Sequence, residues 1–322
     1  TIGSTWRRFK MPAVRGVSRG GEVLINRCRG YLLDVAVRQS HNLKVGIEFS
    51  KKFPASEGYP WRRVVRPVNP LEIPGDPRTV ARELLKPLAF GQEEIQGFLD
   101  NIATFKDLST QEFSRVEIFL SAMIVHVLET GDENSTLTLD LPGRSSVHIP
   151  EHYYTYWVRE TGGEDSHPRD PNELMRYYQT NLLLSYLGDH HSVGTLILNG
   201  NAGAFLAKEA TGGRIILNGE CGWRSCRGLR ITDLLGNPLR GAEIIINGIA
   251  GHDLLDGAHG GFVYINDGTV DGQKVTGSLR SLSSGMSPSR TKAQCFLNGR
   301  RIYPPKKGEK GYSFDHLEDP TP

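Results

Sequence analysis

The sequence predicts an α+β N-terminal region followed by a short right-handed, single-stranded β-helix, that is, a β-solenoid. The first observation is a repeat of strand-like segments, each introduced by a glycine and each ending in asparagine. The four segments are TLILNG at 195–200, RIILNG at 214–219, EIIING at 243–248 and FVYIND at 262–267. Their starts are 19, 29 and 19 residues apart, a spacing typical of a coil that winds once per repeat.

The second observation is that one face of these segments is entirely aliphatic. Side chains alternate along a strand, so the predicted buried face takes two residues from each segment. These residues are Leu196, Leu198, Ile215, Leu217, Ile244, Ile246, Val263 and Ile265. A set of hairpins with Asn-Gly turns is the alternative, but hairpins require no constant period.

The third observation is the asparagine that ends each segment. The four are Asn199, Asn218, Asn247 and Asn266. Asparagine tolerates the left-handed conformation at a tight corner, and stacked side-chain amides can form a hydrogen-bonded ladder. We therefore assign these residues a structural role.

The N-terminal region is predicted as a mixed domain over residues 1–165. Strand-like alternation at 21–25 and 44–50 predicts a β-rich stretch over 1–70. Apolar residues three and four apart predict helices over 78–130, and Ser109 with Glu112 has the spacing of a capping box. Alternation resumes after 135 and predicts a hairpin over 135–160.

The remaining chain divides into three segments. Residues 166–190 are predicted as a linker and a capping helix, which covers 171–187 and stops at Gly188. The β-helix is predicted over 191–277. Residues 278–322 form a C-terminal extension, in which CFLNGRRIY at 295–303 is a hairpin or a degenerate turn.

Composition excludes some classes of function. With 38 basic and 36 acidic residues the net charge is +2, which argues against a nucleic-acid or membrane partner bound through bulk charge. No apolar run of about 18 residues predicts a membrane span. Four scattered cysteines do not suggest a disulfide framework, so a cytoplasmic setting is expected. The chain begins with Thr1, so its natural start is either processed or not included.

The glycine rhythm of the repeats resembles a known family. Gly194–Gly200–Gly203 and Gly213–Gly219–Gly222 look like the GXGXG repeat domain, which occurs in the large chain of glutamate synthase and in the β-helical component of formylmethanofuran dehydrogenases. The resemblance covers about residues 191–277. It implies a right-handed β-helix that supports catalytic parts supplied elsewhere, with no catalytic residues to transfer. Residues 1–190 show no flavin, iron–sulfur or glutaminase motif, so neither family activity is inferred.

The longer spacing between the second and third segments marks an insertion at 220–241. Insertions in solenoids often bind a ligand. This one carries Arg224, Arg227, Arg230 and Arg240, and arginine can receive a carboxylate or a phosphate. The alternative is a solvated loop packed on its neighbours. His252 and Asp253, near His259 and Asp256, are candidates for a small polar site at a corner.

Cys221 and Cys226 are interpreted as small buried apolar residues, with a redox pair as the alternative. No second pair stands nearby to complete a zinc site. We therefore predict no metal and no cofactor.

The outward face of the repeats carries an apolar stripe of Ile197, Ile216, Ile245 and Tyr264. Such a stripe needs cover, from the N-terminal region or from a partner, and we expect the N-terminal region to supply it.

Two functions follow. The first is a non-catalytic scaffold or assembly subunit that docks protein subunits of a larger complex or a second copy. The second is an enzyme or ligand-binding protein with an anion-accepting site between the N-terminal region and the insertion. A flat exposed stripe would favour the first, and a closed pocket with convergent polar groups the second.

Overall fold

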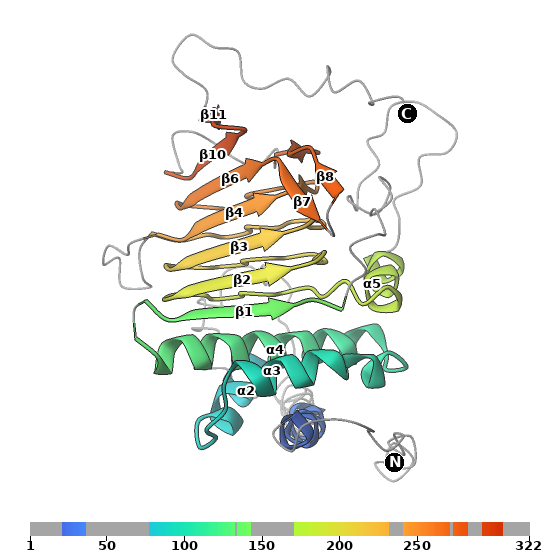
Figure 1. Cartoon of the computed structure of the whole chain (residues 1–322). Coiled ribbons are helices and arrows are strands. Elements are labelled where there is room, and N and C mark those ends of the chain that lie inside the picture. Colours follow the sequence, from blue (N-terminus) through green and yellow to red (C-terminus); the bar gives the residue numbers. More distant parts are fainter. Residues whose placement is uncertain are drawn as a thin grey trace, which may run out of the picture.

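A layer of helices lies at one end of a stack of strands (Figure 1). The computed structural model describes residues 21–36, 77–132, 134–142, 171–231, 241–270, 273–282 and 292–304. The predicted strand at 44–50, the second half of the predicted hairpin, Arg240 and Thr1 lie outside these ranges. No helix in the described ranges is long and apolar enough to cross a membrane.

Seven strands form the main sheet, in the order β1-β2-β3-β4-β6-β10-β11. All neighbouring pairs are parallel except β10 and β11. The strands are β1 (Thr136–Asp140), β2 (Thr195–Asn199), β3 (Arg214–Asn218), β4 (Glu243–Asn247), β6 (Phe262–Asn266), β10 (Gln294–Leu297) and β11 (Arg300–Tyr303). Two small sheets pair β5 (Ile249–Ala250) with β9 (Ser278–Leu279) and β7 (Gly268–Val270) with β8 (Gln273–Val275).

The predicted fold class, an α+β region followed by a β-helix, is wrong. The protein is an α/β structure with one mostly parallel seven-stranded sheet, not a closed solenoid. The segments that link the strands are mainly turns. They take left-handed conformations at alternate residues, for example Phe205, Ala207 and Glu209 with φ of 61°, 55° and 52°. Because these left-handed residues interrupt any extended run, the link segments pair only at short parallel contacts, such as the bridges from Ala202 to Cys221 and from Cys221 to Ala250.

The link segments still hydrogen-bond to one another behind the sheet. The N–H of Phe205 donates to the carbonyl of Trp223 at 3.0 Å, and the N–H of Ala207 donates to the carbonyl of Leu187 at 2.8 Å. Alternate residues thus bond to the neighbouring segment on either side. The backbone polar groups of these turns are satisfied although the turns form no sheet.

Predicted in-register pairing of the repeats is observed, and it sets side chains in three rows across the outer face. The apolar row is Ile197, Ile216, Ile245, Tyr264 and Phe296. The start row is Thr195, Arg214, Glu243, Phe262 and Gln294. The amide row is Asn199, Asn218, Asn247 and Asn266. The eight aliphatic residues predicted for the inner face all have 0% exposure.

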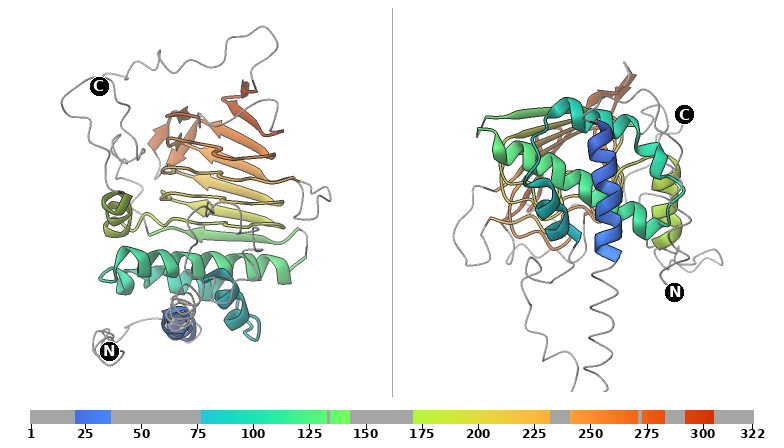
Figure 2. Two further views of the ribbon diagram at one scale, coloured as in Figure 1. Left: turned by 180° about the vertical axis from the view of Figure 1, so that it is seen from behind. Right: turned by 90° about the horizontal axis from the view of Figure 1, so that it is seen from below.

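The helical layer consists of a helix at 21–36, α2 (Pro77–Leu85), α3 (Gln92–Asp100), the 3₁₀ turn η5 (Ile102–Phe105) and α4 (Thr110–Thr130). The capping box is confirmed. The N–H of Glu112 donates to Ser109 Oγ at 3.3 Å, and Glu112 Oε2 accepts from the N–H of Ser109 at 3.0 Å. Helix 21–36 packs beneath α4, where the Tyr31 and Phe119 rings lie 5.0 Å apart (Figure 2).

The strand predicted at 21–25 is wrong, because these residues begin helix 21–36. Five residues are too few to separate a period of two from one of 3.6. Over the longer segment the buried residues recur three and four apart. They are Leu24, Ile25, Cys28, Tyr31, Leu32 and Val35.

The predicted helix at 171–187 is shorter in the structure. Helix α5 (Pro171–Thr180) ends early because Leu182 takes φ of 53° and Tyr186 φ of 60°. The leucines beyond it are buried nonetheless, since Leu184 and Leu187 have 0% exposure. Helix α5 lies beside the strand ends, and α4 lies under β1 (Figure 1).

Buried polar groups join α4 to the segment before β2. The N–H of Ser185 donates to Glu117 Oε1 at 2.8 Å, and the N–H of Asp189 donates to Ser121 Oγ at 3.0 Å. Arg78 of α2 pairs with Asp189 at 2.6 Å. These bonds fix the helical layer in register with the strand stack.

Candidate functional site

Of the arginines predicted to bind an anion, Arg224, Arg227 and Arg230 are described, and each of these three lies on a link segment and faces a carboxylate. The nitrogen–oxygen distances are 3.4 Å for Arg224–Asp256, 3.2 Å for Arg227–Asp256 and 2.9 Å for Arg230–Glu209. Arg224 Nε makes an ion pair with Asp256 but no hydrogen bond. Arg224 Nε also lies 3.7 Å from a carboxylate oxygen of Asp253. Each of the three guanidinium groups therefore has a carboxylate beside it, and an added anion would have to compete with these carboxylates.

Trp223 belongs to an aromatic column that ties the link segments together. Its Nε1 donates to Asp253 at 2.9 Å, and the Arg224 guanidinium lies 4.3 Å from its ring centroid. The ring of Phe205 lies 5.4 Å from Trp223 and 5.0 Å from Tyr186. These contacts account for Trp223 and Arg224 as parts of the packing between link segments.

His252 and Asp253 both bind Ser281. The distance from His252 Nδ1 to Ser281 Oγ is 3.1 Å, and the N–H of Asp253 donates to the same oxygen at 3.1 Å. Burial, with a smaller contribution from Arg280, lowers the pKa of His252 to about 4. His252 is therefore uncharged at neutral pH.

The cysteines are free and buried. Burial raises the pKa of the Cys221 thiol to about 11 and that of Cys226 well above its usual range. Both thiols therefore stay protonated at neutral pH, which opposes thiolate chemistry. Within the described residues, no group of three His, Cys, Asp or Glu side chains could hold a metal ion.

Three of the four asparagines assigned a structural role form a hydrogen-bonded ladder. Asn218 donates to Asn199 at 2.9 Å, and Asn247 donates to Asn218 at 2.8 Å. Asn199 in turn donates to Asp140 of β1 at 2.9 Å. Asn266 lies in register with Asn247 on the neighbouring strand.

A small cavity of about 20 Å³ lies between α2, α4 and the segment before β2, beside Arg78, Ser121, Asp189 and His190. Burial alone would raise the pKa of Asp189, but the hydrogen bond from His190 and the charges of His190 and Arg78 hold it below its usual range. The cavity has room for about one water molecule. It is thus too small for a substrate.

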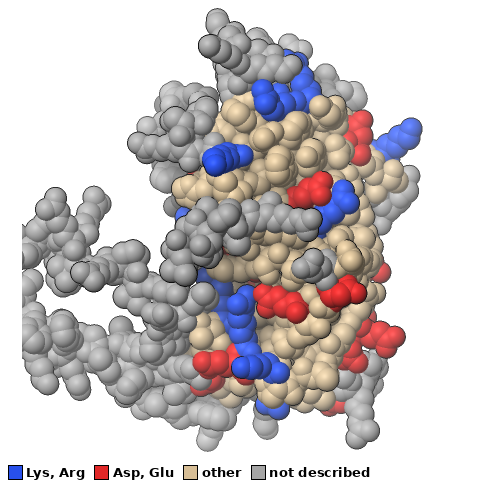
Figure 3. Space-filling model, turned by 90° about the vertical axis from the view of Figure 1, so that its left-hand side faces the viewer, with Lys and Arg blue, Asp and Glu red and all other residues tan. Residues whose placement is uncertain are grey.

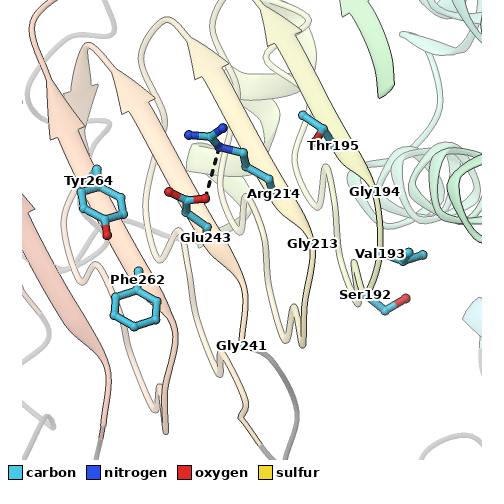
Figure 4. A pocket seen from close by; sticks show the side chains of 10 residues that line it. All are labelled: Ser192, Val193, Gly194, Thr195, Gly213, Arg214, Gly241, Glu243, Phe262 and Tyr264. Carbon is cyan, nitrogen blue, oxygen red and sulfur yellow. Dashed lines mark ion pairs between the residues drawn. The ribbon is translucent and has the colours of Figure 1, made fainter. Parts of the chain in front are cut away.

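The outer face of the sheet carries the larger hollow, a groove of about 490 Å³ at the strand starts (Figure 4). Gly194, Gly213 and Gly241 form part of its floor, and their φ values of 74°, 67° and 77° are ones that glycine adopts readily. Ser192, Val193 and Thr195 line one end, and Phe262 and Tyr264 line the other.

Arg214 and Glu243 face each other across neighbouring strands in the middle of the groove (Figure 4). Their side chains are 3.2 Å apart and are 47% and 40% exposed. The pair is electrically neutral but keeps hydrogen-bonding capacity on both sides. Acidic and basic side chains are also interspersed over the described residues at the strand starts (Figure 3).

The apolar row runs beside this groove and is partly exposed. None of its five residues belongs to the apolar clusters of the interior. Tyr264 and Phe296 stack on each other at 4.9 Å. No helix or strand of the described ranges lies over the row, because the described N-terminal helices lie at the β1 end of the stack (Figure 1).

The sequence predicts four residues of the apolar row as a stripe but not Phe296, which joins the row because β10 pairs in register with β6. No role is predicted for the start row. The signal was present in the outward positions Thr195, Arg214, Glu243 and Phe262, which combine opposite charges and an aromatic ring. The groove itself could not be found in this way, because its depth depends on how the backbones before the strands are placed.

Neither the groove nor the small cavity is lined by Arg224, Arg227, Arg230, His252 or Asp253. Comparisons of the chain with protein-family models, with curated proteins and with solved structures find no match.

Proposed function

We propose that this chain is a non-catalytic scaffold or assembly subunit, which docks another protein on the outer face of its parallel sheet. The observation that carries the proposal is the partly exposed apolar row between two polar rows. Exposed apolar patches with a polar rim are typical of protein interaction sites. A further support is that Phe262, with 38% of its surface exposed, adds an aromatic anchor at the edge of the row.

The alternative of an anion-binding or catalytic site at the insertion has less support. Arg224, Arg227 and Arg230 are paired with carboxylates, and the thiols nearby are protonated at neutral pH. The groove and the small cavity both lie elsewhere in the molecule.

The test is native mass spectrometry of the full chain isolated gently from its own source, together with the variant Ile216→Lys. A lysine in the middle of the apolar row would place a charge in the interface core, where charged residues are depleted. We expect a bound protein subunit in the unaltered chain and its loss in the variant. The matched control is Val23→Lys, which alters another exposed aliphatic residue, 47% exposed and on helix 21–36.

Thermal unfolding of both variants separates loss of docking from loss of folding. Partners that persist with Ile216→Lys, or that are lost equally with Val23→Lys, would contradict docking at the apolar row.

A further inference from the structure

The apolar row has a length and a repeat that restrict what can lie along it. Its residues come from five neighbouring strands, and strands lie about 4.8 Å apart. The row from Ile197 to Phe296 therefore has four intervals and is about 19 Å long. It runs across the strands, so an occupant that follows the row lies perpendicular to them.

An α-helix matches this repeat better than other regular chain conformations. A helix presents a side chain to one face about every 5.4 Å, so its mismatch with the row accumulates to only about 2.4 Å over four intervals. An extended chain presents a side chain every second residue, about 6.7 Å, and loses register within two intervals. Polyproline II repeats at about 9 Å and fits less well.

One rim carries a pair of oppositely charged side chains and the other carries amides, which defines a helix with two different flanks. On one rim Arg214 and Glu243 stand on adjacent strands with their side chains about half exposed. Two helix residues four apart lie about 5–6 Å from each other, so one Glu and one Lys can meet this pair. On the other rim the amide row is neutral. A helix turned end to end would carry its charged flank to the amide row, so the charges fix its direction.

We propose that the apolar row binds one amphipathic α-helix of about three to four turns from another protein, with an acidic and a basic residue on the flank facing Arg214 and Glu243. This inference rests on the proposed docking function and names the partner element. It is the helix-in-groove mode of recognition, in which apolar residues at i, i+4, i+7 and i+11 anchor the helix.

The test uses the full chain and fluorescently labelled synthetic peptides, followed by anisotropy. One 15-residue peptide has leucines at i, i+4, i+7 and i+11 and a Glu four residues before a Lys on one flank. A second exchanges the Glu and Lys. A third has the composition of the first with its leucines at alternate positions. We expect one of the two helical peptides to bind at least tenfold more tightly than the alternating peptide, and Ile216→Lys to lose that binding while Val23→Lys keeps it.

The decisive variant is the double exchange Arg214→Glu with Glu243→Arg, which keeps the intramolecular pair but reverses its order. The preference between the two helical peptides should then invert. The helix proposal would be overturned by any of three results. They are equal binding of all peptides, tighter binding of the alternating peptide, and a preference that does not invert. A homodimer that Ile216→Lys dissociates would overturn it as well, because a second copy would then occupy the row.

The outcomes separate the two proposals. If Ile216→Lys releases the native partner but the peptides show no preference, docking stands and the helix is wrong. If the native partner is retained, both are wrong.

Discussion

Glu117 is the residue at which burial and charge conflict most directly. It lies on α4 with 1% exposure, and its Oε1 accepts a hydrogen bond from the N–H of Ser185. Its Oε2 has no hydrogen-bond partner among the described residues. Burial raises the pKa of Glu117 to about 8, against a usual value of 4.5, although the hydrogen bond from Ser185 opposes the shift. At neutral pH the folded protein therefore holds Glu117 mainly as the neutral acid.

This shift makes the free energy of unfolding depend on pH in a defined window. A folded-state pKa above the unfolded value means that the folded state binds more protons between pH 4.5 and 8, so stability falls as pH rises through that window. Glu117→Gln keeps an acceptor for Ser185 and removes the titration. Relative to this variant, the unaltered chain should lose on the order of 3 to 5 kcal/mol between pH 4.5 and 8.

Urea unfolding of both proteins at intervals across this pH range measures the difference. A difference that stays constant with pH would show that Glu117 titrates normally in the folded state.

At the scale of elements, the first strand of the sheet is protected at its open edge by a helix. Glutamines four residues apart on α3 bond to the backbone of β1. Gln92 Oε1 accepts from the N–H of Thr138 at 3.2 Å, and Gln96 bonds both to the N–H and to the carbonyl of Asp140, at 2.9 and 3.0 Å. The side chains thus take the place of a neighbouring strand. An edge without such cover is a template for pairing with another chain.

Removing both glutamines should therefore cause self-association. In Gln92→Ala combined with Gln96→Ala, the backbone of β1 loses three hydrogen bonds, and we expect dimers or larger species in sedimentation velocity. The control is Glu93→Ala, which shortens an exposed side chain on the same helix but leaves β1 covered. If the double variant sediments as a monomer like the control, then the packing of α3, and not its glutamines, blocks pairing at the edge of β1.

The link segments approach one another so closely that one glycine has no room for a side chain. A Cβ on Gly203 would meet the carbonyl oxygen of Leu183 and the hydroxyl of Ser185. Gly203→Ala should lower the free energy of unfolding by about 1–3 kcal/mol, because the backbones must separate. Gly30 on helix 21–36 has nothing within 4 Å of such a Cβ. Gly30→Ala should instead raise the free energy of unfolding by about 0.5–1 kcal/mol, since glycine in a helix interior is destabilising relative to alanine.

Chemical unfolding of the two variants should give changes in the free energy of unfolding with opposite signs if the backbone at Gly203 lies as close to Leu183 as the structure shows. An equal, small effect of both would mean that the link segments are spaced more widely.

Local chemistry explains which elements were predictable. The capping box at Ser109 and the strand register at the asparagines depend on residues close in sequence or at a fixed period, so both were found. The direction of β1 was not, because Thr136–Asp140 alternates equally well as a hairpin strand and as a strand parallel to β2. The turns behind the sheet were not predicted, because Phe205 and Glu209 have positive φ although phenylalanine and glutamate rarely do.

The site illustrates the same limit. The arginines of the insertion suggested a free anion site, because the sequence separates Arg224 and Arg227 from their acidic partner Asp256 by about thirty residues. Their pairing depends on how the link segment after β3 aligns with the one after β4. The sequence does not give this alignment, because the spacing from the second to the third repeat is 29 residues instead of 19. The apolar row was predictable from Ile197 to Tyr264, since that part follows from the register of the repeats alone, whereas Phe296 was not predicted.

On the scale of the whole molecule, one apolar cluster extends from helix 21–36 through α4 and the sheet to β11. The polar seam at Glu117, Ser121 and Asp189 lies inside this continuous packing and does not divide it. Stacked repeats on their own can unfold in parts, since each contacts only its neighbours. Here the helical layer seals the β1 end, so the helices and the adjoining strands should open together.

The cysteines can test whether the helices and the adjoining strands open together, because all four are buried members of that single apolar cluster. Cys28 reports on helix 21–36, Cys226 on the middle of the stack and Cys295 on β10 near its far end. With N-ethylmaleimide over a urea series and a mass-spectrometric readout of each cysteine, we expect Cys28 and Cys226 to become reactive at the same urea concentration. Cys295 should react at a lower one, because β10 is bordered only by β6 and the short β11. If Cys28 reacts well before Cys226, the helical layer unfolds separately and the seam does not couple it to the strands.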